Sequence, residues 1–429
     1  MRDAILFLAN RLPWPVDDGW KRRTFHVLRA LTRRGPVTLV TFHGGDLREA
    51  DALRDAVPGA LDVVSITPSR STHALSVPLA MVTDTPFLAW RVRSARFTDA
   101  VRRLHAARAF ALAIAGLTHL YRHLRVLPDD CTRVIDTHNI DSVVMGRYAS
   151  NPDRNPAWRW YARRTAGQLR MQELRDFAHA DAVWVCSEAE AAWIRTNVPA
   201  AKAHVVPNGV DTAAFSASEW KPPVAGRMVF FGRMDYHPNA DGVAWFADAM
   251  LPAIRAARPD AELVVAGPGD IPGQRSLESR PGMRLLGAVP DVRPVVASAS
   301  VVVVPLRSGG GTRLKILEAL ALGRPVITTT VGMEGLELVP GRDLLVADDA
   351  VGFAEAVTRV LSDPALAGRL GAAGKAAVTA YDWGAIETAI AALLDDPQIG
   401  RGGALPVSVP AVDPEPGRGA PPVPRSGRG

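Results

Sequence analysis

The segment 300–330, SVVVVPLRSGGGTRLKILEALALGRPVITTT, constrains the fold of this chain more than any other stretch. Four consecutive valines near its start are typical of a strand buried on both faces of a parallel sheet. Three glycines follow at 309–311, and Thr312 is then in position to cap a helix. The helix is predicted to end at Gly323, with a second buried strand over 325–329. A strand, glycine loop, helix and strand in this order indicate a parallel α/β sheet, and the helix N-terminus attracts phosphate.

The predicted helix has one unusual polar stripe. At about 100° per residue its apolar positions cover most of the circumference, and they leave Lys315 and Glu318 together on a narrow exposed stripe. Two interpretations stay open from the helix alone. In the first interpretation, the two residues form an i,i+3 ion pair that contributes roughly a few tenths of a kcal/mol. Alternatively, Glu318 accepts hydrogen bonds from the hydroxyl groups of a ligand while Lys315 faces its phosphates.

Strand and helix patterns alternate along the rest of the chain and predict two doubly wound α/β domains that face each other across a cleft. Residues 68–88 look less regular. Ligands of such sheets bind beyond the carboxyl ends of the strands, where the glycine loop is expected to lie. The predicted division is an N-terminal domain over 1–215, a linker over 216–226, a C-terminal domain over 227–395 whose last helices cross back, and a disordered Gly, Pro and Arg-rich tail over 396–429.

The composition bounds the class of protein. With 429 residues, 48% of them apolar, the chain can form two cores. The formal net charge of +6 comes almost entirely from arginine, since only five lysines occur, and it is too small to indicate a nucleic-acid partner. The two cysteines, Cys131 and Cys186, argue against a disulfide scaffold or a zinc cluster. The first apolar run has six residues, too few for a signal peptide or a membrane span, so we expect a cytoplasmic protein or one on the inner face of a membrane.

Several motifs resemble those of glycosyltransferase family 4. The matching motifs are VVPNGVDTAAF at 205–215, FFGRMD at 230–235, VVAGPGD at 264–270 and the segment 300–330. WPVDDGWKRRTFHVLRAL at 14–31 and DTHN at 136–139 are similar to the bacterial exopolysaccharide branch, which includes sugar transferases linked to PEP-CTERM sorting systems. The resemblance covers roughly 3–395. It implies the GT-B fold of two Rossmann-like domains and retaining, metal-independent transfer from a nucleotide-diphosphate sugar, without a further cofactor, to an exopolysaccharide or cell-surface acceptor, free or lipid-linked.

The resemblance also assigns the donor site. Glu318 matches the second acid of the Glu-x7-Glu motif of the family, which is expected to hold the ribose hydroxyls of the donor. Arg233 matches the arginine that neutralises the donor diphosphate, although a plain surface arginine is the alternative. Lys315 and Arg313 would add positive charge at the same phosphates. The remaining expected donor contacts are Thr312, Gly311, Gly310, Gly309, Gly267 and Gly19.

At two positions the chain departs from the family pattern. The first acid of Glu-x7-Glu contacts the transferred sugar in the family, and Gly310 stands in its place here. The family lysine that follows Gly-Arg is also missing, since the chain reads MDYHPNADG. We expect Lys315 to supply that charge, while the contacts on the sugar side stay open.

The N-terminal domain supplies the remaining candidates. Asp18 and Gly19 are predicted to form a turn before the helix that carries Lys21 and Arg23, which matches the glycine loop of the family near the phosphates and the acceptor. A plain polar turn is the alternative. His138 directly follows a predicted strand and would project into the cleft. The resemblance expects a histidine near the reacting sugar, so His138 is the candidate catalytic residue, with a structural role as the alternative. No acidic cluster or His/Cys set suggests a metal ligand.

A cluster of arginines and two other functions complete the alternatives. Six arginines between 91 and 108 have apolar neighbours, and would either rest on anionic lipid or form a solvated helix face. Gly310 suggests that the chain could instead be a non-catalytic subunit that binds a nucleotide sugar. A nucleotide-sugar epimerase shares the two-domain plan, but it would need acid and base groups around the sugar.

Overall fold

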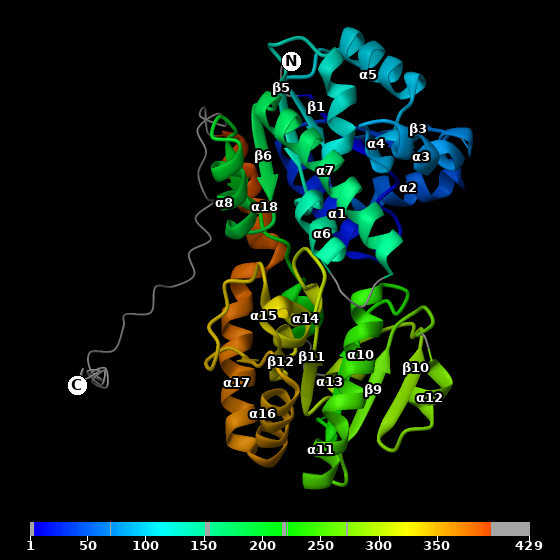
Figure 1. The fold of residues 1–429 in the computed structure, drawn as a ribbon. Coiled ribbons are helices and arrows are strands. Elements are labelled where there is room, and N and C mark those ends of the chain that lie inside the picture. The colour runs from blue at the N-terminus through cyan, green and yellow to red at the C-terminus, as the bar shows by residue number, and fades with distance from the viewer. Residues whose placement is uncertain are drawn as a thin grey trace, which may run out of the picture.

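The computed structural model describes residues 4–68, 70–150, 155–216, 220, 222–271 and 273–395. The predicted tail over 396–429 and residues 217–219 and 221 of the predicted linker lie outside these residues. The described chain forms two parallel sheets with helices packed around each, one above the other in Figure 1.

The first sheet has seven parallel strands in the order β3-β2-β1-β4-β5-β6-β7. Its strands are β1 (Ile5–Ala9), β2 (Val37–Phe42), β3 (Leu61–Ile66), β4 (Leu112–Ala115), β5 (Thr132–Asp136), β6 (Ala182–Val185) and β7 (Ala203–Val205). Successive side chains of a strand point to opposite faces, so Leu6 and Leu8 of β1 join one core, whereas Ile5 and Phe7 join another. Both faces of the sheet are therefore covered, as the continuous apolar strands predict.

The helices of this half include one that the sequence did not predict. They are α1 (Gly19–Arg34), α2 (Leu47–Ala56), α3 (Arg70–Val82), α4 (Phe87–Arg91), α5 (Ala95–Arg108), the 3₁₀ segment η1 (Thr118–Val126), α6 (Asp141–Ser150), α7 (Pro156–His179) and α8 (Glu188–Asn197). The irregular segment expected at 68–88 is wrong, because α3 occupies most of it. Leu75, Val77 and Val82 of α3 are apolar but exposed. The apolar residues of this helix therefore do not mark a single buried face, which is the pattern that predicts a helix.

The second sheet has six parallel strands in the order β10-β9-β8-β11-β12-β13. The strands are β8 (Arg227–Phe231), β9 (Glu262–Ala266), β10 (Met283–Gly287), β11 (Val301–Val304), β12 (Val326–Thr328) and β13 (Leu345–Val346). The helical elements are α9 (Thr212–Ser216), α10 (His237–Ala249), α11 (Leu251–Ala257), α12 (Gln274–Glu278), α13 (Arg293–Ala297), α14 (Leu314–Ala321), α15 (Thr330–Met333), α16 (Ala350–Ser362), α17 (Pro364–Ala377), η2 (Val378–Tyr381) and α18 (Trp383–Asp395).

The last helix, α18, returns to the first sheet and packs beside α1 (Figure 1). Trp383 and Ile386 are buried in the core formed by β1 and α1. The carboxylate of Glu387 is also buried, and it lies 2.7 Å from Nδ1 of His26 and 2.7 Å from Nη2 of Arg33. We keep the division into domains over 1–215 and 227–395 as a proposal.

The glycine loop and α14 deviate locally from the prediction. Helix α14 begins at Leu314, its N-cap position is Arg313, and Thr312 makes no capping hydrogen bond. The predicted cap by Thr312 is therefore wrong. The end of the helix is as predicted, because Gly323 has a φ of 66°, which suits a glycine that terminates a helix.

Candidate functional site

The glycine loop 309–311 and the start of α14 pack directly against the first domain. Arg22 of α1 donates a hydrogen bond to Glu318 of α14. Arg147 of α6 binds both carboxylate oxygens of Glu334 and donates to the carbonyl oxygen of Gly309 at 3.2 Å. The carboxyl ends of strands from both sheets thus meet in one closed region.

Glu318 lies inside this region rather than on an exposed stripe. Glu318 is only 7% exposed, because α1 covers that side of α14. The predicted exposure of Lys315 and Glu318 is therefore wrong, and no ion pair joins these two residues among the described contacts. The role of Glu318 as a ribose ligand stays a prediction.

Lys315 supports the loop after β8. Its Nζ donates to Oδ1 of Asn239 at 2.8 Å and lies 4.0 Å from the ring centroid of Phe230. Burial lowers the pKa of the Lys315 ammonium to about 7, with a smaller contribution from the charge of Arg313. Gly232 has a φ of 141°, and a Cβ there would lie 2.9 Å from Nζ, so only glycine leaves room for the lysine.

Arg233 and Arg313, the two arginines assigned to the donor phosphates, have different surroundings. Arg233 is exposed and pairs with Asp235, 3.1 Å from Nε to Oδ1. The side chain of Arg313 is buried and donates to backbone carbonyl oxygens, those of Gly311 and, at 3.3 Å, Val331. Arg313 thus holds the glycine loop in shape, whereas Arg233 lies at the surface in an ion pair with Asp235.

The other glycines of the predicted site lie where loops approach each other closely. Gly267 has a φ of 143°, and a Cβ there would lie 1.9 Å from the carbonyl oxygen of Gly232. At Gly19 a Cβ would lie 3.2 Å from Cδ1 of Leu314, so the two domains also touch at the start of α1.

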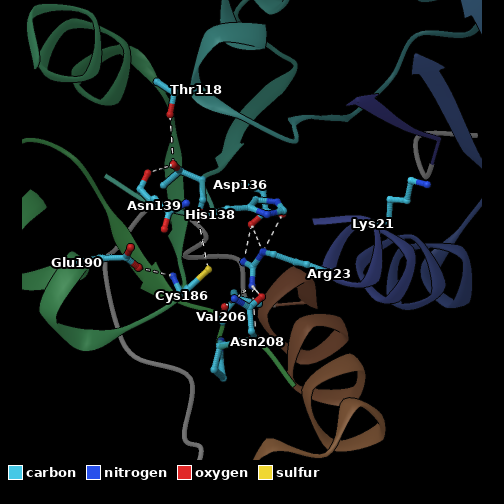
Figure 2. Close-up of polar contacts among 12 residues, drawn as sticks. Lys21, Arg23, Thr118, Asp136, His138, Asn139, Cys186, Glu190, Val206 and Asn208 are labelled. Atoms are coloured by element: carbon cyan, nitrogen blue, oxygen red, sulfur yellow. Dashed lines mark hydrogen bonds and ion pairs between the residues drawn. The ribbon is translucent and has the colours of Figure 1, made fainter. Parts of the chain in front are cut away.

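Asp18 and Lys21 organise the N-terminus of α1. Asp18 caps the helix, since Oδ1 accepts from the backbone N–H of Lys21 at 2.9 Å. The Lys21 ammonium lies 2.8 Å from Oδ1 of Asp17, and its side chain points away from the network around Arg23 (Figure 2). The predicted turn is thus the first turn of α1 itself.

Arg23 lies in a fully buried network (Figure 2). Its guanidinium pairs with Asp136 at the end of β5, with Nε to Oδ1 at 3.1 Å. It also donates to the carbonyl oxygen of Val206 at 2.7 Å and to Oδ1 of Asn208 at 3.2 Å. Arg23 therefore ties α1 to the strand that precedes His138 and to the chain that leaves the first domain. With no exposed surface, it does not reach an acceptor in this arrangement.

His138 follows β5 as predicted. Its Nε2 lies 3.8 Å from Oδ2 of Asp136, and its ring stacks against Trp20 with 6.1 Å between centroids. Nε2 is buried and accepts no hydrogen bond from a described residue. Burial lowers the pKa of His138 to about 4, more than the carboxylate of Asp136 raises it. The imidazole is therefore neutral near pH 7 and offers a hydrogen bond donor and an acceptor.

The packing of the glycine loop explains why Gly310 replaces an acid. A Cβ on Gly310 would lie 2.3 Å from Cγ2 of Val144, and one on Gly311 would lie 2.5 Å from Oδ1 of Asn139. A glutamate at 310 is therefore incompatible with the contact between the loop and α6.

Sequence reasoning missed Glu190, a partly buried acid beside the loop. Its Oε2 accepts from the backbone N–H of Cys186 at 2.9 Å and from the hydroxyl of Ser187 at 3.2 Å. Burial raises the pKa of Glu190 to about 7. The pattern Ser-x-x-Glu at 187–190 would have signalled a capping box, but not its place in the cleft.

No described helix is long and apolar enough to cross a membrane. Nor does a group of three or more His, Cys, Asp or Glu side chains gather as a metal site would need within the part of the chain that the structure describes.

Two sequence families match this chain. The family described as "Glycosyltransferase Family 4" matches residues 18–214, and "Glycosyl transferases group 1" matches residues 225–363. Together these matches cover most of both domains.

Named relatives match over about half of their length. The phosphatidyl-myo-inositol mannosyltransferase of Mycobacterium leprae is 30% identical over 200 residues, which are 43% of this chain and 51% of the relative. The glycogen synthase of Mycobacterium tuberculosis is 28% identical over 198 residues, 44% of this chain and 47% of the relative. The chain thus spans about half the length of the curated relatives it matches.

Solved structures share the fold over nearly the whole described chain. A sucrose-phosphate synthase from Thermosynechococcus elongatus has a TM-score of 0.65 at 20% identity and covers 91% of this chain and 98% of its own. Alr3699/HepE from Anabaena, in complex with UDP, has a TM-score of 0.61 at 14% identity, with 91% and 99% covered. At such identities the likeness concerns the fold, and it confirms the predicted pair of doubly wound domains.

Proposed function

We propose that this chain, which has the GT-B fold and matches glycosyltransferase family 4 over residues 18–214, is a glycosyltransferase that transfers a sugar with retention from a nucleotide-diphosphate donor to a saccharide acceptor. One observation carries this proposal: the glycine loop 309–311 leads into α14, which carries Glu318, and Arg22 and α6 of the other domain contact both. Such a transfer needs a carboxylate that binds the ribose, a helix end that attracts phosphate, and a closed cleft.

The proposed reaction depends on positioning and on charge stabilisation. The donor diphosphate lies at the start of α14, where Arg233 and the ammonium of Lys315 stabilise the negative charge of the leaving group. The two domains exclude water from the sugar while it is transferred. His138, a neutral imidazole, binds a hydroxyl of the sugar or of the acceptor. No metal ion takes part in this scheme.

Two similar proteins support the proposed class of donor. Alr3699/HepE was solved with UDP-glucose, and a relative from Corynebacterium glutamicum is named a GDP-mannose-dependent mannosyltransferase. A panel of UDP and GDP sugars therefore tests the donor first. Released nucleoside diphosphate, measured with a bacterial membrane extract as the source of acceptor, is the expected result.

The same panel separates the rival functions. Binding without release of nucleoside diphosphate from any donor would favour a non-catalytic binding subunit. Conversion of one nucleotide sugar into another, with the diphosphate linkage intact, would favour an epimerase. Transfer is supported if Glu318→Ala abolishes the release of nucleoside diphosphate and the surface variant Glu188→Gln retains it.

For the acceptor we propose an exopolysaccharide or cell-surface precursor carried by a lipid. Leu75, Val77, Met81 and Val82 expose large apolar side chains on α3. The six arginines between 91 and 108 are also exposed; Arg91 lies on α4, which packs against α3, and the others follow between α4 and the end of α5. An apolar and basic surface of this kind binds anionic lipid headgroups. Flotation with vesicles containing phosphatidylglycerol tests this contact, and the variant Val82→Asp is expected to float less.

A further inference from the structure

A pocket lies beside the glycine loop, between α6 and α8 of the first domain. It has a volume of about 160 Å³ and is lined by Val144, Arg147, Glu190, Trp193, Gly310 and Thr312, among others. Roughly 10 to 15 Å³ is enough for one water molecule, so this pocket holds a group much larger than water. Both domains contribute residues to its wall.

Two polar side chains of the pocket have hydrogen-bonding capacity that the protein does not use. Oγ1 of Thr312 is buried and has no partner among the described residues. Oε2 of Glu190 is bound to Cys186 and Ser187, whereas no described residue donates to Oε1. Because the pKa of Glu190 is raised to about 7 by burial, its neutral form is well populated near pH 7, and that form both donates and accepts. Buried polar groups normally have partners, so the unpartnered hydroxyl of Thr312, with the partly buried carboxyl of Glu190 beside it, indicates a ligand with hydroxyl groups.

The remaining wall combines the ion pair of Arg147 and Glu334 with apolar side chains and backbone. Ile140, Val144 and Trp193 supply apolar surface, and Gly310 brings backbone to the pocket without a side chain. Apolar surface with a few placed polar groups is the usual pattern of a small-molecule site. A sugar ring, which has apolar C–H faces and hydroxyl edges, complements this lining.

The position of the pocket along the chain indicates which sugar of the reaction it would bind. Thr312 lies two residues before Leu314, the first residue of α14, and the diphosphate of the donor is expected at that helix end. The group attached directly to the diphosphate is the transferred sugar. We propose that the pocket between α6, α8 and the glycine loop binds this sugar, with Thr312 and Glu190 as the residues that bind its hydroxyls. This assignment rests on the proposed function, and it places on the opposite domain a contact that Gly310 cannot make.

Two variants and one control test the assignment. Thr312→Val keeps the shape of the side chain and removes the hydroxyl. Glu190→Gln keeps an oxygen for the N–H of Cys186 and changes the group in the pocket. Glu188→Gln is the control, because Glu188 lies in the same first turn of α8 but pairs with Arg195 at the surface. Melting temperatures establish that each variant is folded.

The readout is the dissociation constant of a nucleotide sugar divided by that of its nucleoside diphosphate. Calorimetry with UDP, UDP-glucose, GDP and GDP-mannose gives this ratio for whichever pair the wild-type protein binds. We expect Thr312→Val and Glu190→Gln to raise the ratio roughly threefold to tenfold, the effect of one lost hydrogen bond, with nucleoside diphosphate affinity within about twofold of wild type. Glu188→Gln is expected to leave both constants unchanged.

The outcomes separate this assignment from the proposed function. If the wild-type protein binds donors and both variants keep its ratio, the pocket does not hold the transferred sugar and the proposed function still stands. If the variants weaken the nucleotide sugar and the nucleoside diphosphate equally, the two residues act on the nucleotide and the assignment is again overturned. If the wild-type protein binds none of the four probes, the donor site itself fails.

Discussion

Arg22 in α1 donates a hydrogen bond to Glu318 in α14 and thereby joins the two domains across the cleft. Arg22 is 27% exposed in its side chain, whereas that of Glu318 is 9% exposed, so the contact lies at the edge of the closed region. A carboxylate accepts several hydrogen bonds through two oxygens. Glu318 can therefore bind ribose hydroxyls while it keeps Arg22, and the pair closes the site around the nucleotide.

Removing Arg22 tests which partner matters for the nucleotide. We expect Arg22→Ala to change nucleoside diphosphate affinity by less than about threefold, because Glu318 keeps both oxygens and a partly exposed ion pair contributes little. Calorimetry gives the affinity. Loss of binding in Arg22→Ala, as complete as in a Glu318 variant, would show that the ion pair rather than the carboxylate holds the ligand.

The buried ammonium of Lys315 predicts how donor binding depends on pH. With a pKa of about 7 in the free protein, Lys315 becomes neutral as the pH rises from 7 to 9. A diphosphate favours the charged form, so binding takes up a proton there and affinity falls by up to about tenfold per pH unit. Lys315→Met should bind more weakly at pH 7 and show a flatter profile. Equal slopes for both proteins would rule out Lys315 as the source.

The Arg23 and Asp136 pair predicts a large effect on stability. Asp136→Ala leaves the guanidinium of Arg23 buried without its carboxylate, which costs on the order of 3 to 5 kcal/mol in the free energy of unfolding. The exposed pair of Arg233 and Asp235 is the control, and Asp235→Asn should change stability little. Urea unfolding of the three proteins gives the comparison. Similar midpoints for all three would contradict the central role of the buried pair.

Local signals predicted some features correctly. The glycine at 323 ends α14, because a helix end of this kind depends only on neighbouring residues. The continuous apolar strands likewise predicted sheets covered on both faces.

Features that depend on the other domain were not accessible from local pattern. The stripe with Lys315 and Glu318 looked exposed, because helical periodicity does not distinguish solvent from a second domain. Arg23 was expected on the acceptor side of the cleft, yet it is buried with Asp136 and Asn208, which come from positions more than a hundred residues away. The missing acid at Gly310 was visible in the sequence, but its cause, the contact with Val144, was not.

The central claim is that Glu318 binds the ribose of the donor. The most direct measurement is the thermal shift produced by the best-binding nucleotide sugar in wild type, Arg22→Ala and Glu318→Ala. We predict a clear shift in the first two proteins and its loss in Glu318→Ala, with the unliganded variant still folded. A shift in Glu318→Ala as large as in wild type would contradict the claim.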